Sequence, residues 1–97
     1  MSLLQTPVHP GEVLKELYLE LLNVSSIELA RRLRVPRTRI ERLVKGTTSL
    51  TPDTALRLAR VFNTTSAYWI NMQTNFDMSL AAQTIDIAEI EPLVTVA

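Results

Sequence analysis

Basic side chains crowd one short part of this sequence. Of its ten Lys and Arg residues, seven lie between positions 31 and 45, where the single acidic residue is Glu41. They are Arg31, Arg32, Arg34, Arg37, Arg39, Arg42 and Lys45. A guanidinium group can pair with phosphate or bind the edge of a guanine through two parallel hydrogen bonds. The cluster therefore predicts a surface that binds nucleic acid.

The remainder of the chain balances this charge, since the net charge is zero. Six of the ten acidic residues lie near the two ends, at Glu12, Glu16 and Glu20 and again beyond position 85. A run of charge often marks nothing more than a solvated helical face. Such a face normally mixes the two signs, so the segregation favours nucleic-acid binding.

Two short helices are predicted to carry the basic cluster. Ser25 and Glu28 have the spacing of a capping box, so one helix should begin at Ser26. A second should run from about Pro36 to Gly46, because proline suits a first helical position and glycine a left-handed end. Their connection over residues 34–36 has the length of a helix-turn-helix, whose second helix enters the DNA major groove. The residues expected to pack the pair together are Leu29, Ala30, Leu33, Val35, Ile40 and Leu43.

Three further helices are predicted around this pair. The first opens at Pro10 and Gly11, and its buried face should hold Leu14, Leu17, Tyr18 and Leu21, at i, i+3, i+4 and i+7. The next is capped by Thr51 before Pro52 and Asp53 and stops near Asn63. The last begins near Thr65 or Ser66, continues toward Gln83, and places Trp69, Met72 and Phe76 on one side, more consistent with core than with a binding stripe.

No strand pattern, repeat or linker interrupts these helices, which predicts an all-α fold of five helices. We expect a DNA-binding domain over residues 1–83 and a tail over 84–97 that is either a frayed end, the commoner case, or an arm that contacts a dimer partner or another protein. The chain has no cysteine, no basic leader and no long apolar run, so a cytoplasmic protein without membrane contact is expected. His9 is the only histidine and is assigned to packing or capping. No metal or cofactor is predicted.

The last helix and the tail offer the best candidates for a protein interface. Leu80, Ile85, Ile87 and Ile90 add apolar surface that a small core need not absorb, and we assign them to dimerisation or partner contact. Gln73 is open between two interpretations. Its amide is either paired inside the fold or hydrogen-bonded across an interface.

The sequence also resembles the lambda-repressor-like (Xre) regulators, and more closely the HigA-type antitoxins of bacterial toxin-antitoxin modules. The matching motifs span nearly the whole chain. They are VHPGEVLKE (residues 8–16), ELARRL, LVKG, TPDTALRLARVF (51–62) and YWINMQTNFD (68–77). The HPGE opening and the W-x-N-x-Q-x-x-F-D pattern are the specific parts, whereas ELARRL alone would indicate only a helix-turn-helix.

The resemblance implies a homodimeric repressor that binds a palindrome in its own promoter and neutralises a HigB-like, mRNA-cleaving ribonuclease toxin. The antitoxin itself would not be an enzyme. Asp86, Glu89 and Glu91 in the tail would suit a basic, RNA-binding partner. A solitary transcription regulator without a toxin stays open. A small enzyme is disfavoured because the sequence contains neither a nucleophile-base pair nor a phosphate-binding glycine loop.

Roles on the DNA surface follow from position. Arg37, Thr38, Arg39 and Arg42 lie on the exposed side of the second helix and are assigned to base edges. Glu41 would either accept from cytosine or form an ordinary helix salt bridge with Arg37, which we favour. The residues assigned to phosphate contacts are Ser25, Ser26, Arg34, Lys45, Thr47 and Thr48. Arg34 stands where the family often has glycine, so it should carry some strain if its φ is positive.

Overall fold

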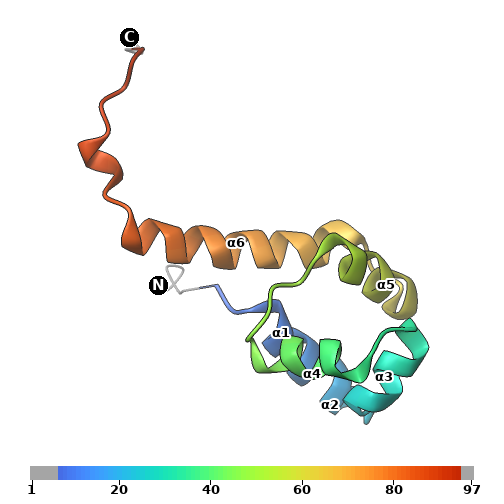
Figure 1. Cartoon of the computed structure of the whole chain (residues 1–97). Coiled ribbons are helices and arrows are strands. Elements are labelled where there is room, and N and C mark those ends of the chain that lie inside the picture. The colour runs from blue at the N-terminus through green and yellow to red at the C-terminus, as the bar shows by residue number, and fades with distance from the viewer. Residues whose placement is uncertain (1–6, 95–97) are drawn as a thin grey trace.

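The computed structural model describes residues 7–94, and all regular structure in that range is helical (Figure 1). The elements are α1 (Pro10–Val13), η2 (Leu14–Leu19), α2 (Glu20–Leu22), α3 (Ser26–Leu33), α4 (Arg37–Lys45), α5 (Pro52–Phe62), α6 (Ser66–Thr84) and the short η3 (Ile87–Glu89). Because α1, η2 and α2 follow one another without a break, they act as one helix. The predicted all-α fold of five helices is confirmed. Within the described range, no helix has both the length and the apolar content that crossing a bilayer requires.

Local capping chemistry sets the helix ends where the sequence predicts them. The Ser25 hydroxyl accepts from the Glu28 amide at 3.1 Å, and Thr51 and Thr65 cap α5 and α6 in the same way. Gly46 and Asn63 adopt left-handed conformations after α4 and α5, with φ of 79° and 56°. Pro36 is the residue before α4 rather than its first residue, a difference of one position.

The first helix buries only part of the predicted face, since Leu14 and, partly, Tyr18 pack into the core. Leu14 is fully buried, but Leu17 and Leu21 are 56% and 72% exposed, and Leu19 takes their place in the core. The cause is the π-helical segment η2. In an α-helix, five residues turn the chain to about 140° from the starting direction, whereas i→i+5 bonding brings residue i+5 back over residue i. Leu14 and Leu19 thereby share a side.

A single core lies between the first helix, α3, α4, α5 and the start of α6. Its largest fully buried side chains include Leu14, Leu29, Ile40, Leu58 and Trp69. Trp69 donates its indole N–H to Thr64 Oγ1 at 2.8 Å, which satisfies its polar group beside the core. The expectation that Trp69 is core is confirmed.

His9 ties the N-terminal segment to the end of α4. Its Nδ1 accepts from the Gly11 amide at 2.9 Å, so Nε2 carries the proton and donates to the Thr48 carbonyl at 3.0 Å. The ring also stacks edge-on against Phe76, with centroids 5.1 Å apart. The predicted capping and packing role is confirmed. Next to it, Gly11 brings α1 against the carbonyl of Leu43 in α4.

The chain leaves the body of the molecule after α6. Residues 85–94 project away from the end of α6 opposite α5, and all of them are exposed (Figure 1). The final residues of the predicted tail, 95–97, lie outside the described part of the chain.

Candidate nucleic-acid interface

The turn between α3 and α4 has the geometry of a helix-turn-helix. Arg34 ends α3 in the left-handed region, with φ 62° and ψ 45°, as its position in the motif suggested. Its amide and that of Val35 return to the last carbonyls of α3, with Val35 N–H donating to Ala30 O at 3.0 Å. A left-handed arginine carries some strain that glycine would avoid. The turn thereby directs α4 across α3.

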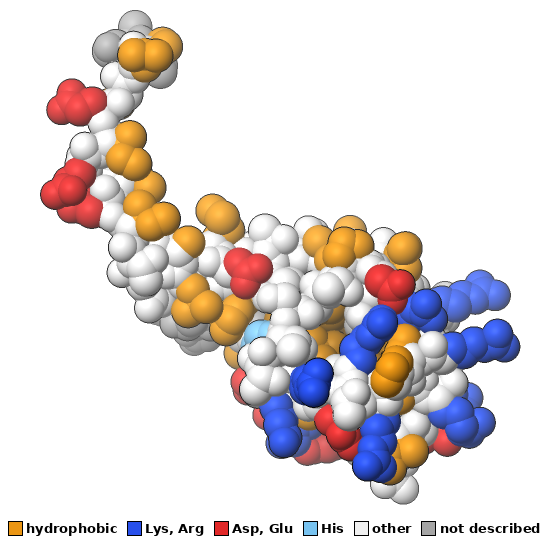
Figure 2. All heavy atoms as spheres, viewed as in Figure 1, with side chains coloured by type: hydrophobic (Ala, Val, Ile, Leu, Met, Phe, Trp, Pro, Cys, Tyr) orange, Lys and Arg blue, Asp and Glu red, His pale blue; other side chains and the backbone are white. Residues whose placement is uncertain are grey.

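Burial on the inner side of the two helices fixes which side of α4 faces outward. Leu29, Leu33, Ile40 and Leu43 are each at most 4% exposed, as predicted, and Ala30 is buried at the close approach. With this face packed inward, the four residues assigned to base edges are all exposed: Arg37, Thr38, Arg39 and Arg42. Lys and Arg side chains gather over α3, α4 and α5 at this end of the molecule (Figure 2).

A shallow hollow runs along α4 beside the loop that follows it. It has a volume of about 500 Å³ and is lined by Thr38, Arg39, Arg42 and Thr48, together with Thr51 and Asp53 at the start of α5. The structure therefore brings three of the four assigned base-contact residues together with one assigned phosphate contact. Arg37 lies outside this hollow, at the first position of α4.

Asp53 forms a link that sequence reasoning did not find. Its Oδ1 accepts from Arg57 Nε at 2.7 Å and from Arg39 Nη1 at 2.8 Å. These hydrogen bonds, first that from Arg57 and then that from Arg39, lower the pKa of the Asp53 carboxyl. The i, i+4 spacing of Asp53 and Arg57 was visible in the sequence. The contact with Arg39 joins two different helices and depends on how they pack.

The other acidic residues of the region pair locally. Glu41 lies 3.7 Å from Arg37 Nε, so the favoured salt bridge is confirmed. Glu28 accepts from both Arg31 and Arg32 at 2.7 Å, and these two bonds, the one from Arg31 first, lower the pKa of its carboxyl. Among the described residues, the basic side chains of the cluster that form no ion pair are Arg34, Arg42 and Lys45.

The residues assigned to phosphate contacts lie at the two ends of α3 and at the end of α4. Ser25 and Ser26 stand at the start of α3, and Arg34 at its end. Lys45, Thr47 and Thr48 lie at and beyond the end of α4 and are exposed. The Thr47 hydroxyl and the Thr47 backbone amide both donate to the Arg42 carbonyl, at 3.1 and 3.0 Å, so both donors are already used within the protein.

Gln73 lies inside the fold. It is 6% exposed, its Oε1 accepts from the Leu50 amide at 2.7 Å, and its Nε2 donates to Asp77 Oδ1 at 2.9 Å. Of the two interpretations left open, the paired interior amide is the one the structure contains, and Gln73 leaves the set of candidate interface residues. Leu80, Ile85, Ile87 and Ile90 are instead exposed. Within residues 7–94, no three His, Asp or Glu side chains gather as a metal site.

Comparison with known proteins agrees with this geometry. Residues 14–69 match the helix-turn-helix family. The chain is 43% identical over 76 residues to virulence-associated protein I of Dichelobacter nodosus, covering 78% of this chain and 70% of that protein.

Two solved structures extend the likeness over almost the entire chain. An addiction module antidote protein of the HigA family from Coxiella burnetii is 39% identical, with a TM-score of 0.81, over 96% of this chain and 100% of that one. The Pseudomonas aeruginosa antitoxin HigA, solved with the higBA promoter, is 34% identical, with a TM-score of 0.83, over 91% of this chain and 99% of that one.

Proposed function

Because this chain belongs to the helix-turn-helix family, in its HigA-type antitoxin group, we propose that it represses its own promoter as a homodimer and neutralises a ribonuclease toxin. The observation that carries the proposal is the exposed basic face of α4. It is turned outward by the buried Ile40 and Leu43 and bordered by a polar hollow. The protein itself acts by binding and not as an enzyme.

In this mechanism α4 enters the major groove and reads base edges through Arg37, Thr38, Arg39 and Arg42. Before DNA binds, Arg39 is paired with Asp53. Both partners are substantially exposed, with side-chain exposures of 42% and 55%, and exposed ion pairs are weak. A guanine edge can therefore replace Asp53 as the partner of Arg39. Until then Asp53 holds the Arg39 side chain at the start of α5.

Residues near the ends of α3 and α4 contact the sugar-phosphate backbone of the DNA. Arg34 and Lys45 carry charge that no described acidic residue pairs, and Ser25, Ser26, Thr47 and Thr48 carry hydroxyl groups near the ends of α3 and α4. Such contacts fix the register of the protein on the duplex without reading its sequence. In a two-fold dimer the two α4 helices would lie about 34 Å apart, so the operator would be a palindrome.

The test of the DNA role is a fluorescence anisotropy titration against the gene's own upstream duplex and a scrambled duplex of equal length. Arg39→Ala should weaken binding to the operator by about 1–3 kcal/mol and leave the scrambled duplex nearly unchanged. Arg31→Ala removes the same kind of side chain from a residue that Glu28 already pairs and serves as the matched control. Equal losses on both duplexes would make Arg39 a phosphate contact.

The toxin is tested by co-expression. The protein is tagged and produced with its flanking reading frames, and whatever elutes in stoichiometric amount is identified. A small basic protein that cleaves mRNA and arrests growth when expressed alone supports the antitoxin role. A homodimer that binds its promoter and captures no partner would instead identify a solitary regulator.

A further inference from the structure

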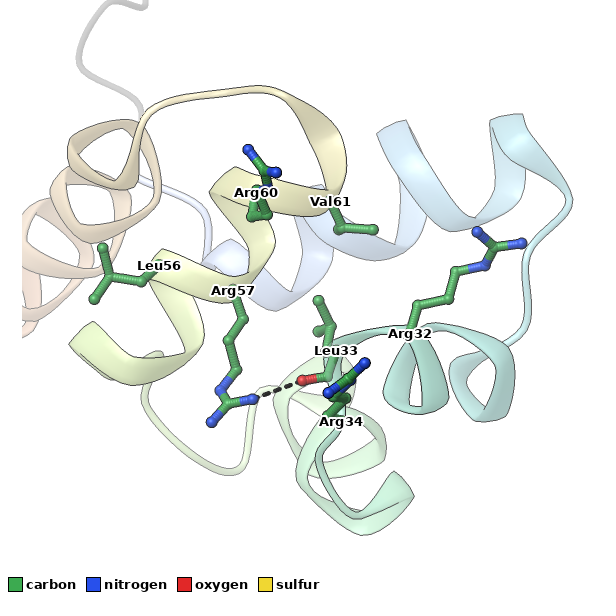
Figure 3. Close-up of a pocket in the computed structure, with 7 residues that line it drawn as sticks. All are labelled: Arg32, Leu33, Arg34, Leu56, Arg57, Arg60 and Val61. Carbon is green, nitrogen blue, oxygen red and sulfur yellow. Dashed lines mark hydrogen bonds between the residues drawn. The ribbon is translucent and has the colours of Figure 1, made fainter.

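A groove lies between the end of α3 and α5, and it is separate from the hollow along α4. It has a volume of about 330 Å³, and its apolar wall consists of Leu33, Leu56 and Val61 (Figure 3). Leu56 is 62% exposed although it stands in the middle of a helix. The groove therefore presents aliphatic surface that the fold of one chain leaves open.

Arginine side chains surround this apolar wall. Arg32 and Arg34 come from α3, and Arg57 and Arg60 from α5. Arg57 is held in place because its Nη1 donates to the Leu33 carbonyl at 2.7 Å, a bond that joins the two helices (Figure 3). Among the described residues Arg60 forms no ion pair; Arg34 forms none either but is assigned above to DNA phosphate. A ligand that fits must be both aliphatic and acidic.

The tail of this same protein has that composition. Ile85, Ile87 and Ile90 are 50%, 63% and 65% exposed. Asp86 and Glu89 lie between them, and neither forms an ion pair within the described chain. A projecting segment this rich in exposed aliphatic residues is typical of an interaction site.

The tail cannot serve the groove of its own chain. It leaves the end of α6 that is opposite α5 (Figure 1), and the 19 residues of α6 rise by about 28 Å at 1.5 Å per residue. Two copies whose α6 helices lie antiparallel would bring each tail to the α5 end of the other copy. Met78 and Leu80 would then supply apolar surface along the pair, since both are exposed on α6.

We propose that the acidic, isoleucine-rich tail of one copy docks in the arginine-rimmed groove between α3 and α5 of a second copy. The exchange is reciprocal, so it closes a two-fold dimer and leaves no groove free to start a filament. This inference rests on the proposed homodimer and identifies the surface that receives the tail. In this dimer Arg60 belongs to the dimer interface, and the outward face of α4 remains free for DNA.

The test exploits the reciprocity of the contact and measures mass by sedimentation velocity in the absence of DNA. Arg60→Glu and Glu89→Arg each place like charges together, so each variant alone should dimerise about tenfold more weakly or worse. In a mixture of the two, both contacts of the heterodimer regain opposite charges, and dimer should return. Glu89 lies in the exposed tail, so Glu89→Arg still tests the contact between tail and groove even if Arg60→Glu impairs folding.

A cross-link gives an independent measurement, because the chain contains no cysteine. Leu56→Cys and Ile87→Cys proteins, mixed under mild oxidation, should form a disulfide-linked heterodimer. Leu17→Cys, also exposed, replaces Leu56→Cys in the control and should not cross-link. The proposal is overturned if the mixture of charge variants stays monomeric, or if removing residues 85–97 leaves dimerisation unchanged.

Two further results would assign the groove elsewhere and also overturn the proposal. Arg60→Glu that keeps the dimer but weakens binding to every duplex equally would make the rim a phosphate-binding surface. Tail removal that abolishes capture of a toxin while the dimer persists would place the tail on the toxin. A wild-type dimer that does not bind its promoter would refute the proposed function but not this dimer.

Discussion

Replacing Gly11 by alanine tests whether α1 and α4 touch as closely as the structure indicates. An alanine Cβ at this position would overlap the carbonyl oxygen of Leu43 and lie 2.7 Å from its carbonyl carbon. Both atoms belong to the backbone of α4, so no side-chain rotation can relieve the overlap. The helix carrying Gly11 must move away from α4.

The size of the effect comes from two opposing terms. Alanine is favoured over glycine by up to about 1 kcal/mol within a helix, and less in a first turn. Overpacking a close contact costs about 1–3 kcal/mol, and more where backbone must shift. We expect a net loss of about 2 kcal/mol, which for a domain of this size lowers the melting temperature by about 8–16 °C.

The assay is urea unfolding followed by the fluorescence of Trp69, the single tryptophan, which is fully buried. Protein concentration is held constant because a dimer links stability to concentration. Glu12→Ala changes the exposed neighbour in the same helix and is the control. A Gly11→Ala protein as stable as wild type, or more so, would refute the close approach of α1 and α4.

Gly46→Ala separates steric overlap from backbone strain. Gly46 has φ +79°, but its added Cβ would meet only His9 Cγ, at 3.8 Å. The cost should therefore be the conformational penalty alone, about 1 kcal/mol. If Gly46→Ala costs more unfolding free energy than Gly11→Ala, backbone conformation and not contact with α4 would dominate the cost of these substitutions.

Three further predictions concern the interior, the acid limit and DNA. Gln73→Met keeps the side-chain length but leaves the Leu50 amide without its acceptor, so urea unfolding should show a loss of about 1–3 kcal/mol; Asp77→Asn, which retains an acceptor oxygen, should lose less. The lowered pKa of Asp53 means that its ion pairs stabilise the fold above the ordinary carboxyl value of 3.8 and are lost as pH falls through the lowered value. Asp53→Asn should thus be less stable than wild type at pH 7 and approach it in acid, and a gap independent of pH would contradict this. Operator affinity should fall by about 10³-fold between 50 and 200 mM salt if a dimer neutralises about six phosphates, and Lys45→Gln in both copies should make that dependence shallower; an unchanged slope would remove Lys45 from the backbone contacts.

The ends of the helices were predictable because local groups determine them. Ser25, Thr51 and Thr65 accept from an amide three residues ahead, and Gly46 supplies the left-handed residue after α4. Such contacts span a few positions and are legible in the sequence. The outward face of α4 was predictable for the same reason, since the spacing of Ile40 and Leu43 sets which side is buried.

Other features depended on how distant segments meet, and local patterns do not encode that. Leu19 is buried in place of Leu17 and Leu21 because part of the first helix is the wider π-helical segment η2. The partner of Gln73 is an amide 23 residues away.

The sequence by itself determined an all-α fold, the helix ends and the basic face of a helix-turn-helix, because capping and periodicity act within one or two turns. Only the tertiary structure decided that Asp53 holds Arg39 across two helices and that arginines from α3 and α5 surround one apolar groove. These arrangements arise from packing between helices, where side chains from separate parts of the chain come within a few ångströms of one another.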